Sequence, residues 1–109
     1  MQGYPLLALA IVCEVIATSC LKLSDGFTRL VPSAITVVFY GISFFVLSLT
    51  LKFIPVGVAY AIWSALGIVL ISMVGYVAFD QKLDIAAMVG MALIIVGVLV
   101  VSVISKAGN

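Results

Sequence analysis

The positions of the charged residues constrain this chain more than any other feature of its sequence. Three uncharged runs cover residues 30–51, 53–79 and 85–105, and each is long enough to cross a bilayer as a helix of about 20 residues. Residues 4–21 form a fourth apolar stretch, in which Glu14 is the single charged residue. The pattern therefore predicts an all-α integral membrane protein with four transmembrane helices.

The composition agrees with this prediction. Hydrophobic residues make up 66% of the chain and charged residues 8%, against about 45–50% and about 25% in soluble globular proteins. The spans leave no room for a soluble domain on either side. We expect a single transmembrane domain over residues 1–109, with helices at about 4–21, 33–51, 58–79 and 85–105.

The same composition argues against several classes of function. A net charge of +1 with no basic run argues against nucleic-acid binding. The chain has no histidine, no plausible metal cluster and no Ser/His/Asp set, so we expect neither a metal, nor a cofactor, nor an enzyme. The expected surroundings are the lipid bilayer.

Glu14 is the candidate proton- and substrate-binding residue. It lies near the middle of the first span with no basic residue close to it in sequence, and a charge at that depth costs about 2.5–3.5 kcal/mol or more. A carboxyl group placed there can hold a proton in one state and a cation in another, which is the chemistry of a proton-coupled carrier. The alternative is a structural acid that stays neutral and hydrogen-bonded to a neighbouring helix.

Helical spacing places further candidates on the faces that surround this acid. The aromatic residues among them permit two interpretations: an aromatic belt at the membrane interface, or a wall that attracts a lipophilic cation. Tyr40 lies deeper than a belt explains, and its hydroxyl needs a partner. The candidate pocket residues are Leu7, Ala10, Ile11, Ala17, Thr18, Tyr40, Ser43, Phe44, Tyr60 and Trp63, and Ser64 and Ile71 follow on the face of Trp63.

Small residues mark where helices can bend or approach one another. Gly67 provides such a position in the third span. In the fourth span, Gly90 and Gly97 lie on one face with Ile94 between them, a spacing that permits close helix packing in lipid. Because four short helices are too few to enclose a large polar cavity, we expect a second copy of the chain to complete it.

Three segments of the sequence resemble the small multidrug resistance family of four-helix bacterial exporters, and the similarity extends from end to end. The glutamate, aromatic and glycine elements occur in the family's order and spacing. The segments are AIVCEVIATSCLKLSDGFTRLVPS around Glu14, IPVGVAYAIWSALGIVLIS around Tyr60 and Trp63, and GMALIIVGV in the last span.

The resemblance implies an antiparallel homodimer in the bacterial inner membrane, in which two Glu14 side chains bind either protons or one cationic substrate. The implied function is proton-coupled export of hydrophobic and quaternary ammonium cations by alternating access, which is multidrug efflux. It also implies dimer packing through Gly90–Gly97. The binding roles that it implies fall on Leu7, Ala10, Ile11, Thr18, Tyr40, Tyr60 and Trp63.

Two departures and three alternatives accompany the resemblance. Ala17 and Ala65 stand where the drug-exporting branch usually has glycine, which narrows the expected pocket and stiffens the expected bend. A guanidinium exporter of the same family usually has a tryptophan shortly after its glutamate, where this chain has Ile16 and Ala17. The chain could also be one subunit of a paired heterodimeric exporter, which the sequence does not dismiss. A proteolipid rotor subunit also carries one acid within the membrane, but it is usually a two-helix hairpin with the acid on a later span, so four spans with the acid in the first argue against it.

Basic residues divide almost evenly between the two sides of the membrane. With four spans, Lys52 and Lys106 share one side, and Lys22, Arg29 and Lys82 share the other. Orientation follows the lysine and arginine count in short loops, with the richer side in the cytoplasm. Three against two is too small a bias to fix one orientation, so we expect the chain to insert both ways.

Overall fold

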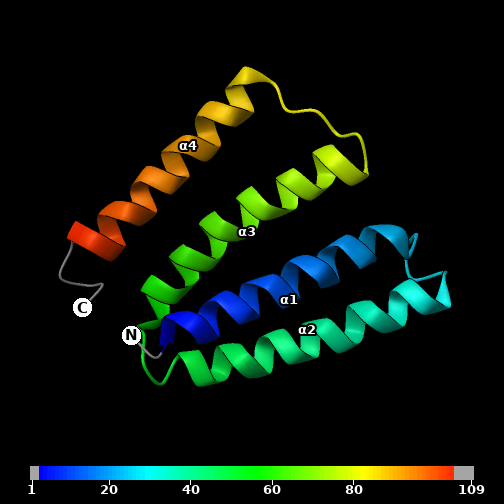
Figure 1. The fold of residues 1–109 in the computed structure, drawn as a ribbon, viewed down its shortest axis with the longest axis horizontal. Helices are drawn as coiled ribbons and strands as arrows, with labels where there is room; N and C mark the ends of the chain where they lie inside the picture. The colour runs from blue at the N-terminus through cyan, green and yellow to red at the C-terminus, as the bar shows by residue number, and fades with distance from the viewer. Residues whose placement is uncertain (1–2, 105–109) are drawn as a thin grey trace.

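The computed structural model describes residues 3–104 as four long helices joined by short connections (Figure 1). They are α1 (Gly3–Leu23), α2 (Leu30–Thr50), α3 (Val56–Ala78) and α4 (Ile85–Leu99), the last extended by a π-helical turn at Val100–Ile104. No strand occurs within residues 3–104. All four helices, with the π-helical turn included in the fourth, are long and apolar enough to span a membrane, which confirms the predicted fold class.

The helices lie side by side in one layer, in the order α2, α1, α3, α4 (Figure 1). The layer measures 45 × 36 × 17 Å, so its thickness is less than half of either other dimension. The two inner helices therefore each have a neighbour on both sides, whereas both outer helices present a broad face outward.

The helix ends differ from the expected ones by up to three residues. α2 begins at Leu30 instead of residue 33, because Pro32 is tolerated within a first turn whose N–H groups have no intrahelical partner. α3 begins at Val56 instead of residue 58, directly after Pro55. The fourth span begins at the expected residue, where the Asp84 side chain accepts a hydrogen bond from the backbone of the first turn, and its expected last residue, 105, lies outside the described residues.

α1 and α2 are joined by two buried hydroxyl groups. Ser43 donates to the carbonyl oxygen of Ala10 at 2.8 Å. The Thr36 hydroxyl lies 2.8 Å from the carbonyl oxygen of Pro32 in its own helix and 3.3 Å from that of Ala17, and it shares its one hydrogen between them. Both alanines are fully buried, and their small side chains allow α2 to approach closely. Because donors and acceptors are each seven residues apart, the two bonds hold the helices in one register.

A small apolar cluster fixes the beginning of α3 against α1. In lipid, such a cluster stabilises by packing and not by exclusion of water. Its buried members are Leu7, Ile11, Val15, Ile54, Val58 and Ala59. The cluster holds α1 and α3 together, and Trp63 and Ile71, which also line the site described below, pack against it.

α4 is bound much more loosely than the other helices. No residue of α4 or of the π-helical turn is buried, and α3 is the long helix that it packs against. Its surface is apolar all round, which is typical of a helix surrounded by lipid or by another membrane protein.

Candidate functional site

The Glu14 carboxylate accepts a hydrogen bond at each of its oxygens. The indole Nε1 of Trp63 donates to Oε1 at 3.1 Å, and the hydroxyl of Thr18 donates to Oε2 at 2.5 Å. Thr18 lies one turn after Glu14 on α1, whereas Trp63 comes from α3. The acid is therefore oriented by two different helices, as the cost of placing a carboxylate at this depth requires.

A second hydroxyl extends this set of bonds to α2. The oxygens of Thr18 and Tyr40 lie 2.7 Å apart. A hydroxyl has one hydrogen to donate, and Thr18 uses it on Glu14, so Tyr40 is the donor in this pair. The chain of bonds runs from Tyr40 through Thr18 to Glu14 and supplies the partner that the sequence required for the Tyr40 hydroxyl.

Three aromatic rings stack beside these bonds. The Tyr40 and Phe44 centroids are 6.1 Å apart at an interplanar angle of 14°, and those of Phe44 and Trp63 are 6.3 Å apart at 25°. Phe44 is 59% exposed. The row joins α2 to α3 and presents an aromatic face next to the acid, an arrangement that attracts organic cations.

Gly67 allows the carboxylate to lie directly against α3. A Cβ atom at this position would lie 3.3 Å from Glu14 Oε1 and 3.7 Å from Trp63 Cδ1. Any side chain here would press on the bond between Trp63 and Glu14. The sequence predicted a hinge or packing role for Gly67, which stays a prediction, and the structure adds this close approach.

Some of these groups line a cavity of about 270 Å³, whereas the predicted pocket residues Tyr40 and Phe44 do not belong to its lining. Apart from the carboxylate its lining is uncharged, and it includes Ile68, which the sequence analysis did not name although it lies next to Gly67. A deprotonated carboxylate in such surroundings can bind a proton or a cation. The lining residues are Glu14, Thr18, Trp63, Ser64, Gly67, Ile68 and Ile71.

Comparison of the sequence with known proteins identifies the family of this chain. The family model described as Small Multidrug Resistance protein matches residues 2–94. The quaternary ammonium compound-resistance protein QacE of Escherichia coli is 56% identical over 107 residues, covering 98% of this chain and 97% of QacE. The chain belongs to the small multidrug resistance family. The multidrug transporter EmrE of Escherichia coli strain K12 is 50% identical over 106 residues, covering 97% of this chain and 96% of EmrE.

Family membership confirms the resemblance seen in the sequence. With four membrane-spanning helices, it makes the chain a multi-pass protein of the bacterial inner membrane and supports a role in drug efflux. It also points to a transporter and not to an enzyme. Within residues 3–104 of this small multidrug resistance protein, no group of three or more His, Cys, Asp or Glu side chains comes together.

Several predicted pocket residues of this small multidrug resistance protein lie elsewhere in the chain. Leu7 and Ile11 belong to the apolar cluster, and Ala10, Ala17 and Ser43 lie between α1 and α2. None of the five lines the Glu14 cavity. Their contact with a substrate stays a prediction.

Tyr60 does not line the Glu14 cavity. Its side chain is 71% exposed on the outer surface of the chain, and it borders a separate hollow of about 50 Å³ that Trp63 also lines. Within one chain Tyr60 therefore does not complete the Glu14 cavity. A binding role for this residue requires a substrate or a second chain on that outer surface.

The predicted packing residues of α4 face open space. A Cβ atom on Gly90 or Gly97 would have no neighbour within 4 Å, and Ile94 is exposed. Close packing at these glycines is absent from the described part of this chain. Their packing against a second copy stays a prediction.

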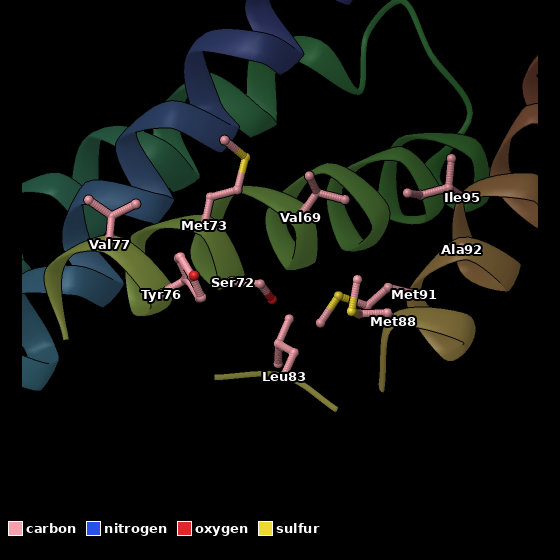
Figure 2. Close-up of a pocket in the computed structure, with 10 residues that line it drawn as sticks. All are labelled: Val69, Ser72, Met73, Tyr76, Val77, Leu83, Met88, Met91, Ala92 and Ile95. Carbon is pink, nitrogen blue, oxygen red and sulfur yellow. The ribbon is translucent and has the colours of Figure 1, made fainter. Parts of the chain in front are cut away.

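A further hollow of this family member lies between α3 and α4 and was not anticipated from the sequence. It has a volume of about 640 Å³, and Met88 and Met91 of α4 project into it beside Leu83 (Figure 2). Its lining carries no charge and shares no residue with the Glu14 cavity. The lining residues are Val69, Ser72, Met73, Tyr76, Val77, Leu83, Met88, Met91, Ala92 and Ile95.

Proposed function

We propose that this chain is a proton-coupled antiporter that exports hydrophobic and quaternary ammonium cations by alternating access. The observation that carries the proposal is the Glu14 carboxylate, which faces a cavity whose lining contains no positive side chain. A cation that enters this cavity meets one negative charge and apolar walls. A proton can occupy the same carboxylate, so proton and cation compete for it.

The aromatic row supports an organic cation over a metal ion as the substrate. Phe44 and Trp63 offer stacked ring faces beside the acid, and a ring face attracts cations whose hydration shell is weak. QacE is a quaternary ammonium compound-resistance protein and EmrE is a multidrug transporter, which agrees with this class of substrate.

An antiparallel homodimer is part of the proposal. A cavity of about 270 Å³ is smaller than most small-molecule sites, which measure about 300–1,000 Å³, so a bulky cation needs additional walls. A second copy would supply them, together with a second Glu14. The open space beside Gly90 and Gly97 supports α4 as the packing surface, because small residues permit close approach in lipid.

Guanidinium export is the second candidate. The small size of the cavity favours a small planar cation, and a carboxylate can pair with a guanidinium group through two parallel hydrogen bonds. One oxygen of Glu14 is already engaged by Trp63 and the other by Thr18, so such a pairing would have to displace or share these donors.

Flux from proteoliposomes that contain only this chain tests the proposal. With a pH gradient, we expect uptake of tetraphenylphosphonium coupled to proton movement, and loss of both in Glu14→Gln. Preference for guanidinium would select the second candidate. Absence of flux for either cation from the homomeric chain would contradict the proposal and favour a subunit that requires a different partner.

A further inference from the structure

The Glu14 cavity continues toward one end of the molecule. A second cavity of about 180 Å³ lies beside it between α1 and α3, and the two share Thr18 and Ile71 in their linings. The lining residues of the second cavity are Thr18, Ser19, Lys22, Ile71, Gly75, Phe79 and Gln81. The two neighbouring cavities lie in a row from Glu14 to the C-terminal ends of α1 and α3, which lie side by side (Figure 1). We take this row of cavities as the passage through which a cation would move.

The sequence builds this passage from two regular spacings. On α1, Glu14, Thr18 and Lys22 follow one another at four-residue intervals and so share one face. On α3, Gly67 and Gly75 lie eight residues apart. Gly67 makes room for the Glu14 carboxylate, and Gly75 makes room for the side chain of Gln81.

A cation and an aromatic ring meet at the outer end of the passage. The Lys22 Nζ lies 5.9 Å from the centroid of the Phe79 ring, within the range of cation–π attraction. Lys22 is exposed and Phe79 is half-buried. A positive group thus occupies the aromatic face at the mouth of a passage that leads to a carboxylate.

The chain after α3 folds back to hold this ring in place. The backbone N–H groups of Phe79 and Gln81 both donate to the carbonyl oxygen of Gly75, at 3.1 and 2.9 Å. The Gln81 amide oxygen lies against the same glycine, 2.8 Å from where a Cβ atom would be. The backbone at Phe79 is therefore held by the end of its own helix, and Phe79 lines the second cavity.

We propose that Lys22 and Phe79 form a gate across this end of the passage, in which the Lys22 ammonium group occupies a ring face that an organic cation uses on its way to or from Glu14. The inference rests on the proposed function, because it requires an organic cation that travels to Glu14. The cation competes with Lys22 for the same ring and exchanges places with it. Lys22 therefore slows passage in both directions without changing the site at Glu14.

The rate of cation binding distinguishes this gate from a purely structural contact. Lys22→Met removes the ammonium group and keeps a long apolar side chain. Tetraphenylphosphonium should then associate and dissociate about 2–5-fold faster, with a nearly unchanged Kd, because the competing cation–π contact is lost. Trp63 is the only tryptophan of the sequence and bonds to Glu14, so its fluorescence in stopped-flow mixing reports arrival at the site.

Three matched variants separate the gate from a general effect of charge. Lys22→Arg keeps a cation over the ring and should keep the slow rates. Lys52→Met removes another exposed positive charge, from the α2–α3 connection at the opposite end of the molecule, and should leave the rates unchanged. In Phe79→Leu the ring is absent, so adding Lys22→Met should give no further acceleration.

The outcomes also separate the gate from the proposed function. An equal acceleration in Lys52→Met, or a gain from Lys22→Met that persists without the Phe79 ring, would overturn the gate while cation binding remained intact. A parent chain in which tetraphenylphosphonium changes neither Trp63 fluorescence nor proton release would overturn the proposed function itself. If Lys22→Met fails to fold by circular dichroism, Lys22→Gln tests the same prediction.

Discussion

The indole of Trp63 donates a hydrogen bond of 3.1 Å to the carboxylate of Glu14, joining residues that are 49 positions apart in the sequence. The bond ties the acid on α1 to the N-terminal half of α3. It also places the only aromatic N–H donor of the chain on the group that we propose to bind both proton and substrate. Movement of α3 relative to α1 therefore changes the surroundings of the acid directly.

The first prediction separates the ring of Trp63 from its N–H group. Trp63→Leu removes both and should lower the affinity for tetraphenylphosphonium by about 1–2 kcal/mol, the range for a desolvated cation–π contact. Trp63→Phe keeps a ring and should lose less. Equilibrium binding in detergent measures both, with Tyr76→Leu as a control, because Tyr76 borders the α3–α4 hollow and not the acid. Equal losses at positions 63 and 76 would assign Trp63 to the interfacial belt.

The second prediction concerns pH. If proton and cation compete for Glu14, cation affinity should rise as pH rises, because the proton is removed from the shared group. Binding should release protons in the parent chain and none in Glu14→Gln, which keeps the shape of the side chain without its charge. Calorimetry in buffers of different ionisation enthalpy counts the protons. Undiminished release from Glu14→Gln would rule out this carboxylate as the shared site.

The third prediction ranks the two hydroxyl groups. Thr18→Val removes the donor to Oε2 and leaves Tyr40 without this partner, so the carboxylate is held less firmly toward the cavity. We expect a loss of cation affinity of about 1.5–3 kcal/mol, as for a hydrogen bond to a charged group. Tyr40→Phe removes only the outer bond and should cost about 1 kcal/mol. The reverse order, measured in the same binding assay, would contradict the arrangement Tyr40–Thr18–Glu14.

The fourth prediction uses glycine positions that differ only in their surroundings. In Gly67→Ala the new Cβ would lie 3.3 Å from Glu14 Oε1, so the carboxylate must shift and its bond to Trp63 weakens, at a cost in cation affinity of roughly 1 kcal/mol. Gly41→Ala places its Cβ in open space and should bind normally. Titration of both variants with tetraphenylphosphonium measures the difference. Normal affinity in Gly67→Ala would show that the close contact between position 67 and the Glu14 carboxylate does not matter for cation binding.

The fifth prediction concerns orientation in the membrane. The side that holds Lys52 and Lys106 has two basic residues, and the other side has three, so the chain should insert both ways. Adding two lysines after Lys106 should favour one orientation and reduce transport by the chain alone. In the chain without the added lysines, a cysteine placed in the C-terminal tail should be labelled from both sides of the membrane in intact cells. Labelling from one side only, with full transport, would exclude the antiparallel homodimer.

The sequence was sufficient to predict the helices because their signal is local. Uncharged runs of span length identify four membrane helices whatever their neighbours are. The prediction of Glu14 as the central acid was local in the same sense, since a charge within an apolar span has a cost that must be met somewhere. Helix ends were less accurate, because a residue such as Pro32 is compatible with several positions near the start of a helix.

The sequence could not predict which helix packs against each helix face. Helical spacing shows which residues point in the same direction, but it does not show which other helix they contact. Ala10 and Ala17 share a face with Glu14 by spacing, yet the structure places them under α2, where Ser43 and Thr36 bond to their carbonyl oxygens. The bond between Trp63 and Glu14 depends on how α1 and α3 pack. Nothing in the local sequence around either residue specifies that contact.

The paired bonds between α1 and α2 limit the ways in which this molecule can move. Sliding α2 along α1 by one residue would break both bonds at once and bring bulkier neighbours of Ala10 and Ala17 against α2. We therefore expect α1 and α2 to move together as one unit. If the proposed function holds, a change of access to Glu14 requires α3 to move relative to this pair, which alters the bond between Trp63 and Glu14.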